Sequence, residues 1–413
     1  MEKLRLGILG TGKRGKSVTL ECLVPRENVE ITALCDVYED KMQAVADEIV
    51  KAGKKAPKLY SNYKDVIAAE DVDAVVVTAS WDLHVPMACD AMEAGKPVAL
   101  EVSGAYSIDD CWQLVRTYER TGTKIMFMEN ACYSKRALAV LNMVREGLFG
   151  EVVHCAGGYR HDLRGEVTTG KERRHYRLRN YLNRNGENYP THELGPIAKV
   201  LNINYGNRMI SLTSTASKSR GMHENVRSRD NRDKSLLDIE FMQGDIITTV
   251  IKCARGETIT LTLDTCLPRY FHGAFDIDVH GTKGLYEGAT RSVYIDLDEE
   301  CEKNHDDWQP CWGNMDTKYY DKYEHNVWKH LKNEATRGDH DGLDWITYGA
   351  FVDAVVNDYD PPMDVYDAAA WMAITTLSED SIACGSMPVP VPDFTNGKWL
   401  EREKRNVSPI YGI

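Results

Sequence analysis

A glycine-rich turn directly after the first apolar run constrains the fold of this chain more than any other feature. The strand-like run Leu4–Leu9 ends in the turn Gly10-Thr11-Gly12-Lys13-Arg14-Gly15, and a helical pattern over Lys13–Leu23 follows. In such a turn the first glycine permits a tight bend, the second lets a pyrophosphate approach the backbone, and the third lets the helix pack closely on the strand. The helix N-terminus adds free amides and a positive dipole end. The sequence therefore predicts a βαβ unit that binds a dinucleotide.

An acidic residue at the end of the next strand indicates which dinucleotide is bound. Asp36 follows the strand-like run Val29–Cys35, about 20 residues beyond the turn, where a carboxylate accepts the ribose hydroxyls. A 2′-phosphate would meet a like charge there, so NAD is favoured over NADP. We expect these two segments to contact the cofactor through Gly10, Thr11, Gly12, Lys13, Arg14, Gly15 and Asp36. Lys13 and Arg14 are expected to close over the pyrophosphate.

Further cofactor contacts are expected past three later strand-like runs, because dinucleotides lie along the carboxyl ends of parallel strands. These runs are Ala74–Val77, Pro97–Leu100 and Lys124–Met128. Taken singly, Trp81 is better explained by packing and His84 by a place at the start of a helix, but their positions past a strand end favour contact. The expected residues are Ser80, Trp81, Asp82, His84, Glu101, Val102 and Asn130.

The order of the predicted elements divides the chain in two. Up to about residue 130, strand-like runs alternate with helical patterns, which predicts an α/β fold with a doubly wound parallel sheet. From about residue 150, strand-like runs such as Val152–Tyr159 and Ile246–Cys253 are linked by turns and long polar loops, which predicts a large, mostly antiparallel open sheet. We expect one domain over residues 1–130 and an α+β domain over residues 131–413, whose C-terminal segment packs back toward the first. The segment His161–Asn188 is expected to be a long basic loop without regular structure.

Charge and cysteine content exclude several classes of function. The chain has 63 acidic and 50 basic residues and a formal net charge of −13, which argues against a nucleic-acid or anionic-membrane partner. Its 11 cysteines include no CxxC pair, and no cluster has metal-ligand spacing, so we expect free thiols, no metal and a reducing, cytoplasmic location. No run approaches the ~20 apolar residues of a membrane helix. The N-terminus has no signal-peptide pattern, and a leader removed from the chain stays open as an alternative.

Several of these segments resemble a known superfamily. The glycine-rich turn, Thr78–His84 and Gly95–Glu101 resemble the Gfo/Idh/MocA oxidoreductases. Those enzymes pair a Rossmann domain with an α+β domain whose open sheet carries the substrate. Most members have Glu-Lys-Pro at a strand end, and its lysine assists proton transfer from the substrate hydroxyl. This chain has Glu101-Val102-Ser103 there and lacks that lysine. The motif therefore does not predict an ordinary dehydrogenase of this superfamily.

A narrower resemblance, to glycoside hydrolase family 109, extends from residue 1 to about residue 400. It is carried by segments that include Met128–Tyr133, Leu141–Glu151, Tyr159–Arg164, Tyr189–His192 and Asp364–Ala369. Members are NAD-dependent α-N-acetylgalactosaminidases and relatives that act by a redox-assisted elimination. The resemblance implies the same class of enzyme here, a small carbohydrate as substrate, and a homo-oligomer, either a dimer or a tetramer.

The resemblance also implies site residues. Substrate contacts are implied for Tyr159, Arg177, Tyr189, Pro190, Thr191, His192 and Tyr270. His192 is expected nearest the C3 hydroxyl of the sugar, with Tyr189 or Tyr159 assisting at C2 or C1. Arg177 and Tyr270 are expected to hold sugar oxygens. Histidine and tyrosine suit these roles because proton transfer works best with a pKa near the operating pH, or tuned toward it.

Three positions depart from the usual pattern of the family. The motif Tyr-Pro-Thr-His-Gly ends here in Glu193, Trp-Arg is replaced by Tyr176-Arg177, and His-Gly-Gly-Met-Asp is replaced by the run His340–Asp344. All are expected near the sugar pocket, so the identity of the sugar stays open. Two other functions stay open as well: a sugar or glycoside dehydrogenase that releases NADH, and a non-catalytic module that only binds NAD.

Overall fold

The computed structural model of the protein divides into two compact units. It describes residues 3–413 except residues 104, 175, 271, 274–276, 303–310, 332–339 and 403–404, and it leaves the side chains of residues 173, 300 and 302 undescribed. Unit 1 comprises Met1–Tyr133, His325–Ala369 and Glu403–Ile413. Unit 2 comprises Ser134–Glu324 and Ala370–Arg402. Each unit has its own sheet, and we describe them in turn.

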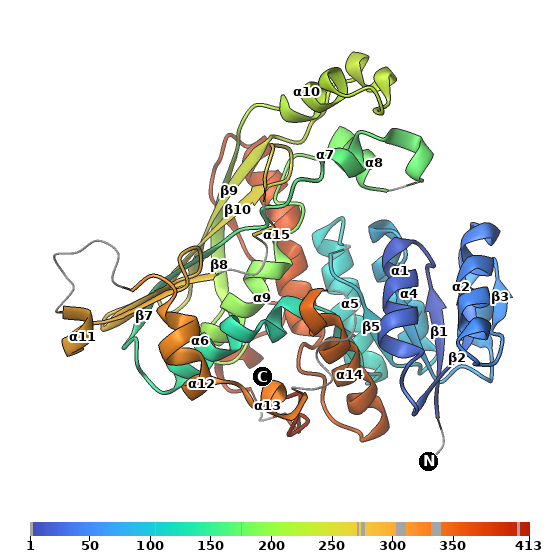
Figure 1. The fold of residues 1–413 in the computed structure, drawn as a ribbon, viewed down its shortest axis with the longest axis horizontal. Helices are drawn as coiled ribbons and strands as arrows, with labels where there is room; N and C mark the ends of the chain where they lie inside the picture. The colour runs from blue at the N-terminus through green and yellow to red at the C-terminus, as the bar shows by residue number, and fades with distance from the viewer. Residues whose placement is uncertain are drawn as a thin grey trace. The chain divides into compact units, whose positions relative to one another are not determined.

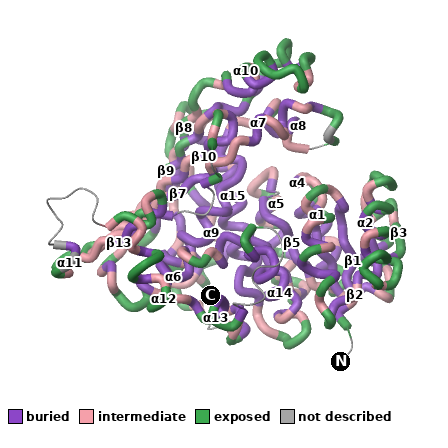
Figure 2. Tube along the Cα trace, in the orientation of Figure 1, coloured by how far each residue is buried: buried purple, intermediate pink, exposed green. Residues whose placement is uncertain are grey.

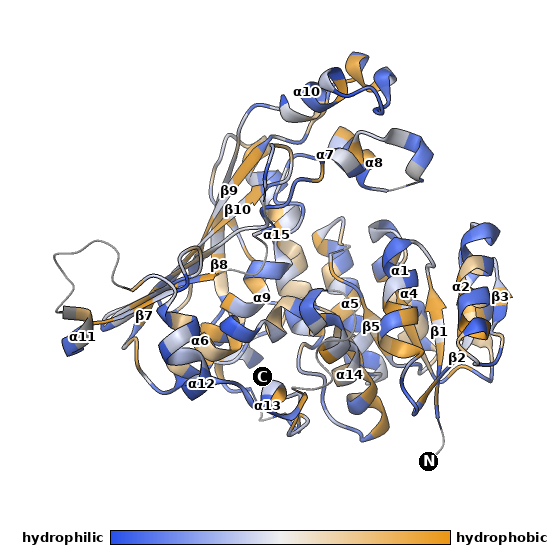
Figure 3. Ribbon diagram, viewed as in Figure 1, coloured by the Kyte–Doolittle hydropathy of each residue, from blue (hydrophilic) through white to orange (hydrophobic). Residues whose placement is uncertain are grey.

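The sheet of unit 1 is six-stranded and parallel, in the order β3-β2-β1-β4-β5-β6. Its strands are β1 (Leu4–Leu9), β2 (Val29–Cys35), β3 (Lys58–Tyr60), β4 (Ala74–Val77), β5 (Val98–Leu100) and β6 (Ile125–Phe127). Apart from the edge strand β3, the strands are almost entirely buried, as expected for a parallel sheet covered by helices (Figure 2). The apolar sequence of β1 stands out in the hydropathy view (Figure 3). The predicted doubly wound α/β sheet is confirmed.

Helices connect these strands and cover the sheet (Figure 1). They are α1 (Lys13–Ser17), which continues as a π-helical turn over Val18–Leu23, α2 (Glu39–Lys51), α3 (Tyr63–Ala68), α4 (Trp81–Glu93) and α5 (Ile108–Thr121). The helix α5 begins with a capping box between Ser107 and Asp110 and ends at Gly122, whose φ of 65° closes the last turn. Two later helices, α13 (Asn326–Leu331) and α14 (Leu343–Val356), also belong to unit 1.

The sheet of unit 2 is eight-stranded, in the order β13-β12-β11-β7-β10-β9-β8-β14. Its strands are β7 (Val152–Gly157), β8 (Met209–Ala216), β9 (Ile246–Cys253), β10 (Thr258–Asp264), β11 (Ile277–Gly281), β12 (Gly284–Glu287), β13 (Ser292–Ile295) and β14 (Val389–Pro390). Within the described part of unit 2, β7 and β10 pair in parallel and the other neighbouring strands are antiparallel. The strict alternation of buried and exposed residues along β9 reflects one covered face. The predicted mostly antiparallel sheet is confirmed.

Helices of unit 2 pack on this sheet and on one another. The helix α9 (Thr191–Val200) contacts β7 and β11, and α6 (Lys135–Arg145) contacts α9. Further helices of unit 2 include α10 (Gly221–Ser228), α11 (Glu299–Glu302) and α12 (Tyr320–Tyr323), while α15 (Val365–Ala383) begins in unit 1 and continues in unit 2. No helix within the described ranges is long and apolar enough to cross a membrane.

The structure corrects the expectation of a long irregular loop over His161–Asn188. Two short helices lie there, α7 (Arg164–Val167) and α8 (Arg177–Asn183), with a 3-10 turn over Gly170–Arg173 between them. Helices of four and seven residues are too short to display hydrophobic periodicity in the sequence. They form because their few apolar side chains, such as Leu178 and Tyr181, are buried by the rest of the unit.

Candidate active site

The glycine-rich turn of unit 1 has the geometry that its three glycines predict. Gly10 has a φ of +105°, and a Cβ there would lie 2.6 Å from the backbone nitrogen of Ala79. A Cβ at Gly15 would lie 1.9 Å from the carbonyl oxygen of Gly10. Among the described residues, and apart from the two residues next to Gly12 in the chain, no heavy atom lies within 4 Å of such a Cβ at Gly12. Two glycines are therefore required by packing, while the middle one leaves open space beside the backbone, where a pyrophosphate would approach.

Asp36 is held beside this turn. Thr11 donates two hydrogen bonds to Asp36 Oδ2, from its backbone N–H at 2.7 Å and from its hydroxyl at 3.1 Å. The backbone N–H of Tyr38 donates to Asp36 Oδ1 at 3.0 Å. Since a carboxylate accepts about four hydrogen bonds, one more acceptor position is left for a ribose hydroxyl.

The later strand ends place the other predicted cofactor residues. Trp81 and His84 are buried in the first turn of α4, after Ser80 and beside Asp82. The ring nitrogens of His84 lie 2.8 Å from the carbonyl oxygen of Ser103 and 3.1 Å from that of Ala79. Burial nonetheless lowers the pKa of His84. These contacts tie the end of β4 to the segment that follows β5.

Arg14 is bound by two carboxylates of unit 1. Its guanidinium donates to Asp344 in a fork, at 2.6 Å from Nη1 and 2.7 Å from Nη2, and its Nε donates to Glu101 Oε1 at 3.0 Å. The hydroxyl of Tyr348 also donates to Glu101 Oε1, and Asn130 donates to Asp344 Oδ1, each at 2.8 Å. Burial alone would raise the pKa of Asp344, but the Arg14 guanidinium holds it well below its ordinary value. The predicted contact between Arg14 and the pyrophosphate stays a prediction.

Two buried polar atoms beside these strand ends have no hydrogen-bond partner among the described residues. They are Asn130 Oδ1, after β6, and Ser103 Oγ, after β5. Buried polar atoms are nearly always paired, so an unpaired one calls for a bound group or a functional role. Together with the open space at Gly12 and the carboxylate of Asp36, they fit a dinucleotide along the carboxyl edge of this sheet.

In unit 2, three of the predicted substrate residues form one aromatic cluster. The ring centroids of Tyr159 and Tyr189 lie 4.3 Å apart, those of Tyr189 and His192 lie 4.8 Å apart, and those of Tyr159 and His192 lie 5.6 Å apart. Tyr159 follows β7, whereas Tyr189 and His192 flank the start of α9. A Cβ at Gly157 would lie 2.8 Å from the Cβ of Glu193. A glycine at the end of β7 thus lets α9 approach closely enough to bring the three rings together.

Arg177, another predicted substrate residue, lies against this cluster. Its guanidinium carbon is 5.3 Å from the Tyr189 ring centroid, and its Nε is 4.0 Å from Glu166 Oε1. Burial raises the pKa of Tyr159 to about 12, although the neighbouring Arg177 opposes the rise. Tyr159 is therefore a protonated phenol at neutral pH and a hydrogen-bond donor.

The segment Glu187–Thr191 concentrates buried polar atoms without partners. Glu187 Oε2, Asn188 Oδ1 and Thr191 Oγ1 have no hydrogen-bond partner within the described part of the chain. All three residues are at most 2 % exposed. Burial raises the pKa of Glu187 to about 8, so this carboxyl is protonated at neutral pH. Three buried polar atoms without a partner among the described residues, within five residues and beside a cluster of aromatic rings, indicate a site where a polar ligand supplies the missing hydrogen bonds.

The structure does not bring every predicted residue into the cluster. Pro190 precedes α9 and Thr191 begins it, but Tyr270 is 96 % exposed, whereas Tyr159, Tyr189 and His192 are buried. Sequence reasoning missed His161 and His272, whose ring centroids lie 4.0 Å apart beside Tyr159, and it missed the partnership of Asp344 with Arg14. The position of His161 two residues after Tyr159 was the available signal, because alternate residues of an extended chain share a face.

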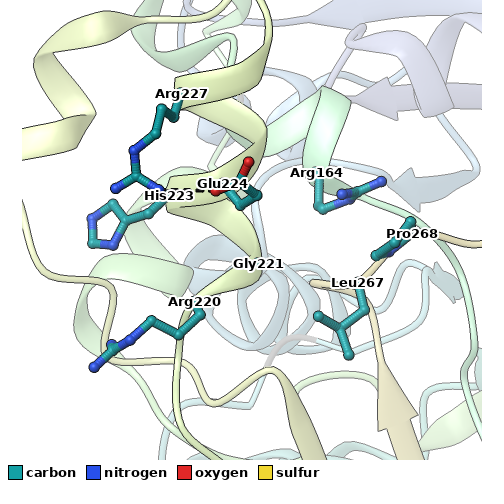
Figure 4. A pocket seen from close by; sticks show the side chains of 8 residues that line it. All are labelled: Arg164, Arg220, Gly221, His223, Glu224, Arg227, Leu267 and Pro268. Atoms are coloured by element: carbon teal, nitrogen blue, oxygen red, sulfur yellow. Dashed lines mark hydrogen bonds and ion pairs between the residues drawn. The ribbon is translucent and has the colours of Figure 1, made fainter.

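A pocket of about 510 Å³ lies elsewhere in unit 2 (Figure 4). It is lined by Arg164, Arg220, Gly221, His223, Glu224, Arg227, Leu267 and Pro268. Of its three arginines, Arg164 pairs with Asp162 and Arg227 with Glu224, while Arg220 donates to the carbonyl oxygen of Ser219. None of the predicted site residues lines it, although Arg164 and Pro268 stand close in the chain to His161 and Tyr270. Among the residues that the structure describes, no group of three or more His, Cys, Asp or Glu side chains is arranged to hold a metal ion.

Comparisons with known proteins match both units. Residues 4–129 match the model of the oxidoreductase family with an NAD-binding Rossmann fold, and residues 133–401 match that of the glycosyl hydrolase 109 C-terminal domain. An α-N-acetylgalactosaminidase of Tannerella forsythia is 40 % identical over 97 % of this chain and 88 % of its own length. A glycosyl hydrolase family 109 protein of Stenotrophomonas maltophilia is 39 % identical over 97 % of this chain and 91 % of its own length.

Solved structures resemble the fold at lower identity. Levoglucosan dehydrogenase in complex with NADH and levoglucosan superposes with a TM-score of 0.68, at 16 % identity, over 95 % of this chain and 100 % of its own. An NAD-binding oxidoreductase from Klebsiella pneumoniae gives a TM-score of 0.69 at 16 % identity, over 95 % of this chain and 99 % of its own. At such identities the likeness concerns the fold alone.

Proposed function

The chain belongs to the glycosyl hydrolase 109 family, and we propose that it is an NAD-dependent glycosidase for α-N-acetylgalactosaminides or closely related glycosides. It is an enzyme with an NAD-binding Rossmann domain. The observation that carries the proposal is the cluster of Tyr159, Tyr189 and His192 beside Arg177, in a chain whose relatives include an α-N-acetylgalactosaminidase. A ring cluster of this kind stacks on a sugar face while its polar ends reach the hydroxyls.

The chemistry differs from that of an ordinary glycosidase, which places two carboxylates across the scissile bond; NAD-dependent families are exceptions. When bound, NAD supplies transient oxidation of the sugar's C3 hydroxyl to a ketone, which makes the neighbouring C2 proton acidic. The protein's own residues then have three tasks. They accept the proton of the C3 hydroxyl, accept the C2 proton, and donate a proton to the glycosidic oxygen as it leaves C1.

We assign these tasks within the cluster. His192 is the proton acceptor for the C3 hydroxyl, because a neutral imidazole has one ring nitrogen that can accept a proton. Tyr189 or Tyr159 assists at C2 or C1, and Arg177, beside both, stabilises the phenolate that forms where a phenol donates its proton to the leaving oxygen. Pro190 shapes the start of α9, Thr191 offers its unpartnered hydroxyl to the sugar, and the exposed Tyr270 contributes only when substrate is bound.

In unit 1 we assign cofactor contacts to the turn Gly10–Gly15, to Asp36, and to Ser80, Trp81, Asp82, His84, Glu101, Val102 and Asn130. The unpartnered Asn130 Oδ1 and Ser103 Oγ are available to hydrogen-bond donors of the cofactor. We further propose that residues 1–130 form the NAD-binding domain and residues 131–413 the domain for substrate and oligomerisation, with a C-terminal segment that packs back toward the first; the assignment of His325–Ala369 to unit 1 supports such a segment. All 11 cysteines are free, which supports a reducing, cytoplasmic setting. A dimer or tetramer is expected, and light scattering after size-exclusion chromatography measures it.

The decisive experiment incubates purified protein with a series of aryl glycosides, beginning with aryl α-N-acetylgalactosaminide. We expect phenol release over many turnovers with no net formation of NADH, which absorbs at 340 nm whereas NAD does not, because a recycled cofactor leaves no product NADH. Stoichiometric NADH from free sugar, without phenol release, would establish a dehydrogenase instead. NAD binding without turnover on any member of the series would establish a binding module.

A further inference from the structure

A second histidine is hydrogen-bonded to the cluster and has no role in the proposed reaction. The hydroxyl oxygen of Tyr159 lies 2.9 Å from Nδ1 of His161. Both residues belong to the extended segment after β7, which forms two backbone hydrogen bonds with Asp264 at the end of β10. The N–H of Asp264 donates to the carbonyl oxygen of Tyr159, and the N–H of His161 donates to the carbonyl oxygen of Asp264, each at 3.0 Å. The backbone of the pair is therefore fixed, and the two side chains meet as a consequence.

The surroundings of His161 favour a neutral ring. Burial and then the nearby Arg177 lower the pKa of His161 to about 4. The titratable and charged groups that face it are Tyr159, Asp162, Glu166, Arg177, His192 and His272. The ring of His272 packs on it at 63°, with centroids 4.0 Å apart. Neutral at physiological pH, the ring presents one nitrogen as an acceptor and the other as a donor.

The direction of the hydrogen bond follows from the protonation states. The Tyr159 phenol keeps its proton, since burial raises its pKa to about 12. It therefore donates to Nδ1, and His161 carries its own proton on Nε2. With its hydrogen turned toward His161, the phenol oxygen presents its lone pairs to the other side, where they can accept hydrogen bonds from Arg177 and from a sugar hydroxyl.

We propose that His161 is a positioning residue that acts through Tyr159, by accepting the phenolic hydrogen at Nδ1 and so fixing which way the Tyr159 oxygen presents its lone pairs to the substrate. This inference rests on the proposed function. His161 holds the hydrogen bond and does not store the proton, because its ring is a weak base in this environment. A side chain with an acceptor at the same place and no basicity should therefore replace it.

Asparagine provides such a side chain, because its Oδ1 occupies the place of Nδ1, and leucine provides similar bulk with no acceptor. We expect His161→Leu to lower kcat for the aryl glycoside by about 10- to 100-fold, the loss that a misplaced reacting group causes, with KM changed less than about threefold. His161→Asn should restore kcat to within about fivefold of the unsubstituted enzyme. His154→Asn is the matched control, since His154 bonds Thr258 on the same sheet away from the cluster, at 2.8 Å.

A double-mutant cycle with Tyr159→Phe tests whether His161 acts through the phenol. Removing both residues should cost no more than Tyr159→Phe alone, because the acceptor has no function without its donor. Additive losses would overturn the proposal, as would a leucine variant with unchanged kcat or an asparagine variant as slow as the leucine one. Unfolding temperatures within a few degrees of the parent show that all variants are folded.

The same variants separate this inference from the proposed function. If the unsubstituted enzyme releases NADH from free sugar and hydrolyses no glycoside, the glycosidase proposal fails. The role of His161 is then tested in the sugar oxidation, where we again expect the leucine variant to have a lower kcat than the asparagine variant. If the unsubstituted enzyme hydrolyses the glycoside and the variants follow the contrary pattern, only the role of His161 fails.

Discussion

Arg14 and Asp344 are 330 positions apart in the chain, yet the guanidinium of Arg14 and the carboxylate of Asp344 meet in a two-pronged ion pair of 2.6 and 2.7 Å. Asp344 is completely buried in the first turn of α14. The pair fastens the helix that follows the glycine-rich turn, and Asn130 bonds the same carboxylate from the end of β6. A residue late in the chain thereby holds in place the glycine-rich turn and the strand end that form the candidate NAD site in the first 130 residues.

The substitution Asp344→Asn should weaken NAD binding by about tenfold and lower the unfolding temperature by several degrees. Removing one partner of a buried pair costs about 3–5 kcal/mol, because the other charge is left uncompensated, and Glu101 retains part of Arg14. Calorimetric titration with NAD and thermal unfolding measure the two effects. Asp341→Asn is the control, since Asp341 is exposed three residues earlier; equal behaviour of the two variants would refute the role of the pair.

The substitution Asp36→Ser should reduce the preference for NAD over NADP. In the proposed site this carboxylate faces the ribose and would repel a 2′-phosphate, and its hydrogen bonds to the ribose hydroxyls would be charge-assisted and worth about 1.5–3 kcal/mol. We expect NAD to bind about 10- to 100-fold more weakly and NADP to bind more tightly than in the parent. Equilibrium titrations with both dinucleotides test this, and Glu39→Gln, on the exposed first turn of α2, should change neither affinity.

The turn and Asp36 could be found from the sequence because their signals are local. Glycine spacing and a strand followed by an acid are encoded within about 30 residues, and the structure gives the turn the required conformation. The partnership of Arg14 with Asp344 was beyond such reasoning, because nothing local to either residue specifies the other. The same holds for His272, which meets His161 only because separate segments converge in unit 2.

The residues of the candidate sugar site were predicted from a family resemblance, whereas their contacts with one another are known only from the structure. Tyr189 and His192 could be selected from their motif, but their contact with Tyr159 depends on the close approach of α9 to Gly157. The helices α7 and α8 escaped prediction because short helices depend on tertiary burial. The exposed position of Tyr270 also follows from tertiary structure, which a motif does not describe.

The substitution His192→Ala should abolish hydrolysis and leave NAD binding intact. A positioned acid or base contributes about 10²–10⁴-fold to the rate, and His192 lies in unit 2, apart in the chain from the predicted cofactor residues. Initial rates with the aryl glycoside and titration with NAD measure the two properties. His280→Ala, on β11, is the matched control. Undiminished turnover in the His192 variant would remove this residue from the mechanism.

The substitution Glu187→Gln should remove a loss of stability that the parent protein suffers as the pH rises. Burial raises the pKa of Glu187 from 4.5 to about 8 in the folded protein, so the folded state binds this proton more tightly than the unfolded chain does. The stability contributed by the bound proton is complete below pH 4.5 and is lost as the pH rises toward about 8, by about 1.4 kcal/mol for each pH unit. Glutamine keeps the shape and does not titrate.

Denaturant unfolding at pH 5 and pH 8 tests this linkage. We expect the two proteins to differ little at pH 5 and the glutamine variant to have the larger free energy of unfolding at pH 8, by a few kcal/mol. Glu224→Gln is the control, because Glu224 is exposed on α10 and its substitution should leave the pH dependence unchanged. If the parent and the Glu187 variant showed the same pH dependence, this carboxyl would be ionised in the folded protein. The backbone N–H of Tyr189 would then donate its hydrogen bond to a buried carboxylate.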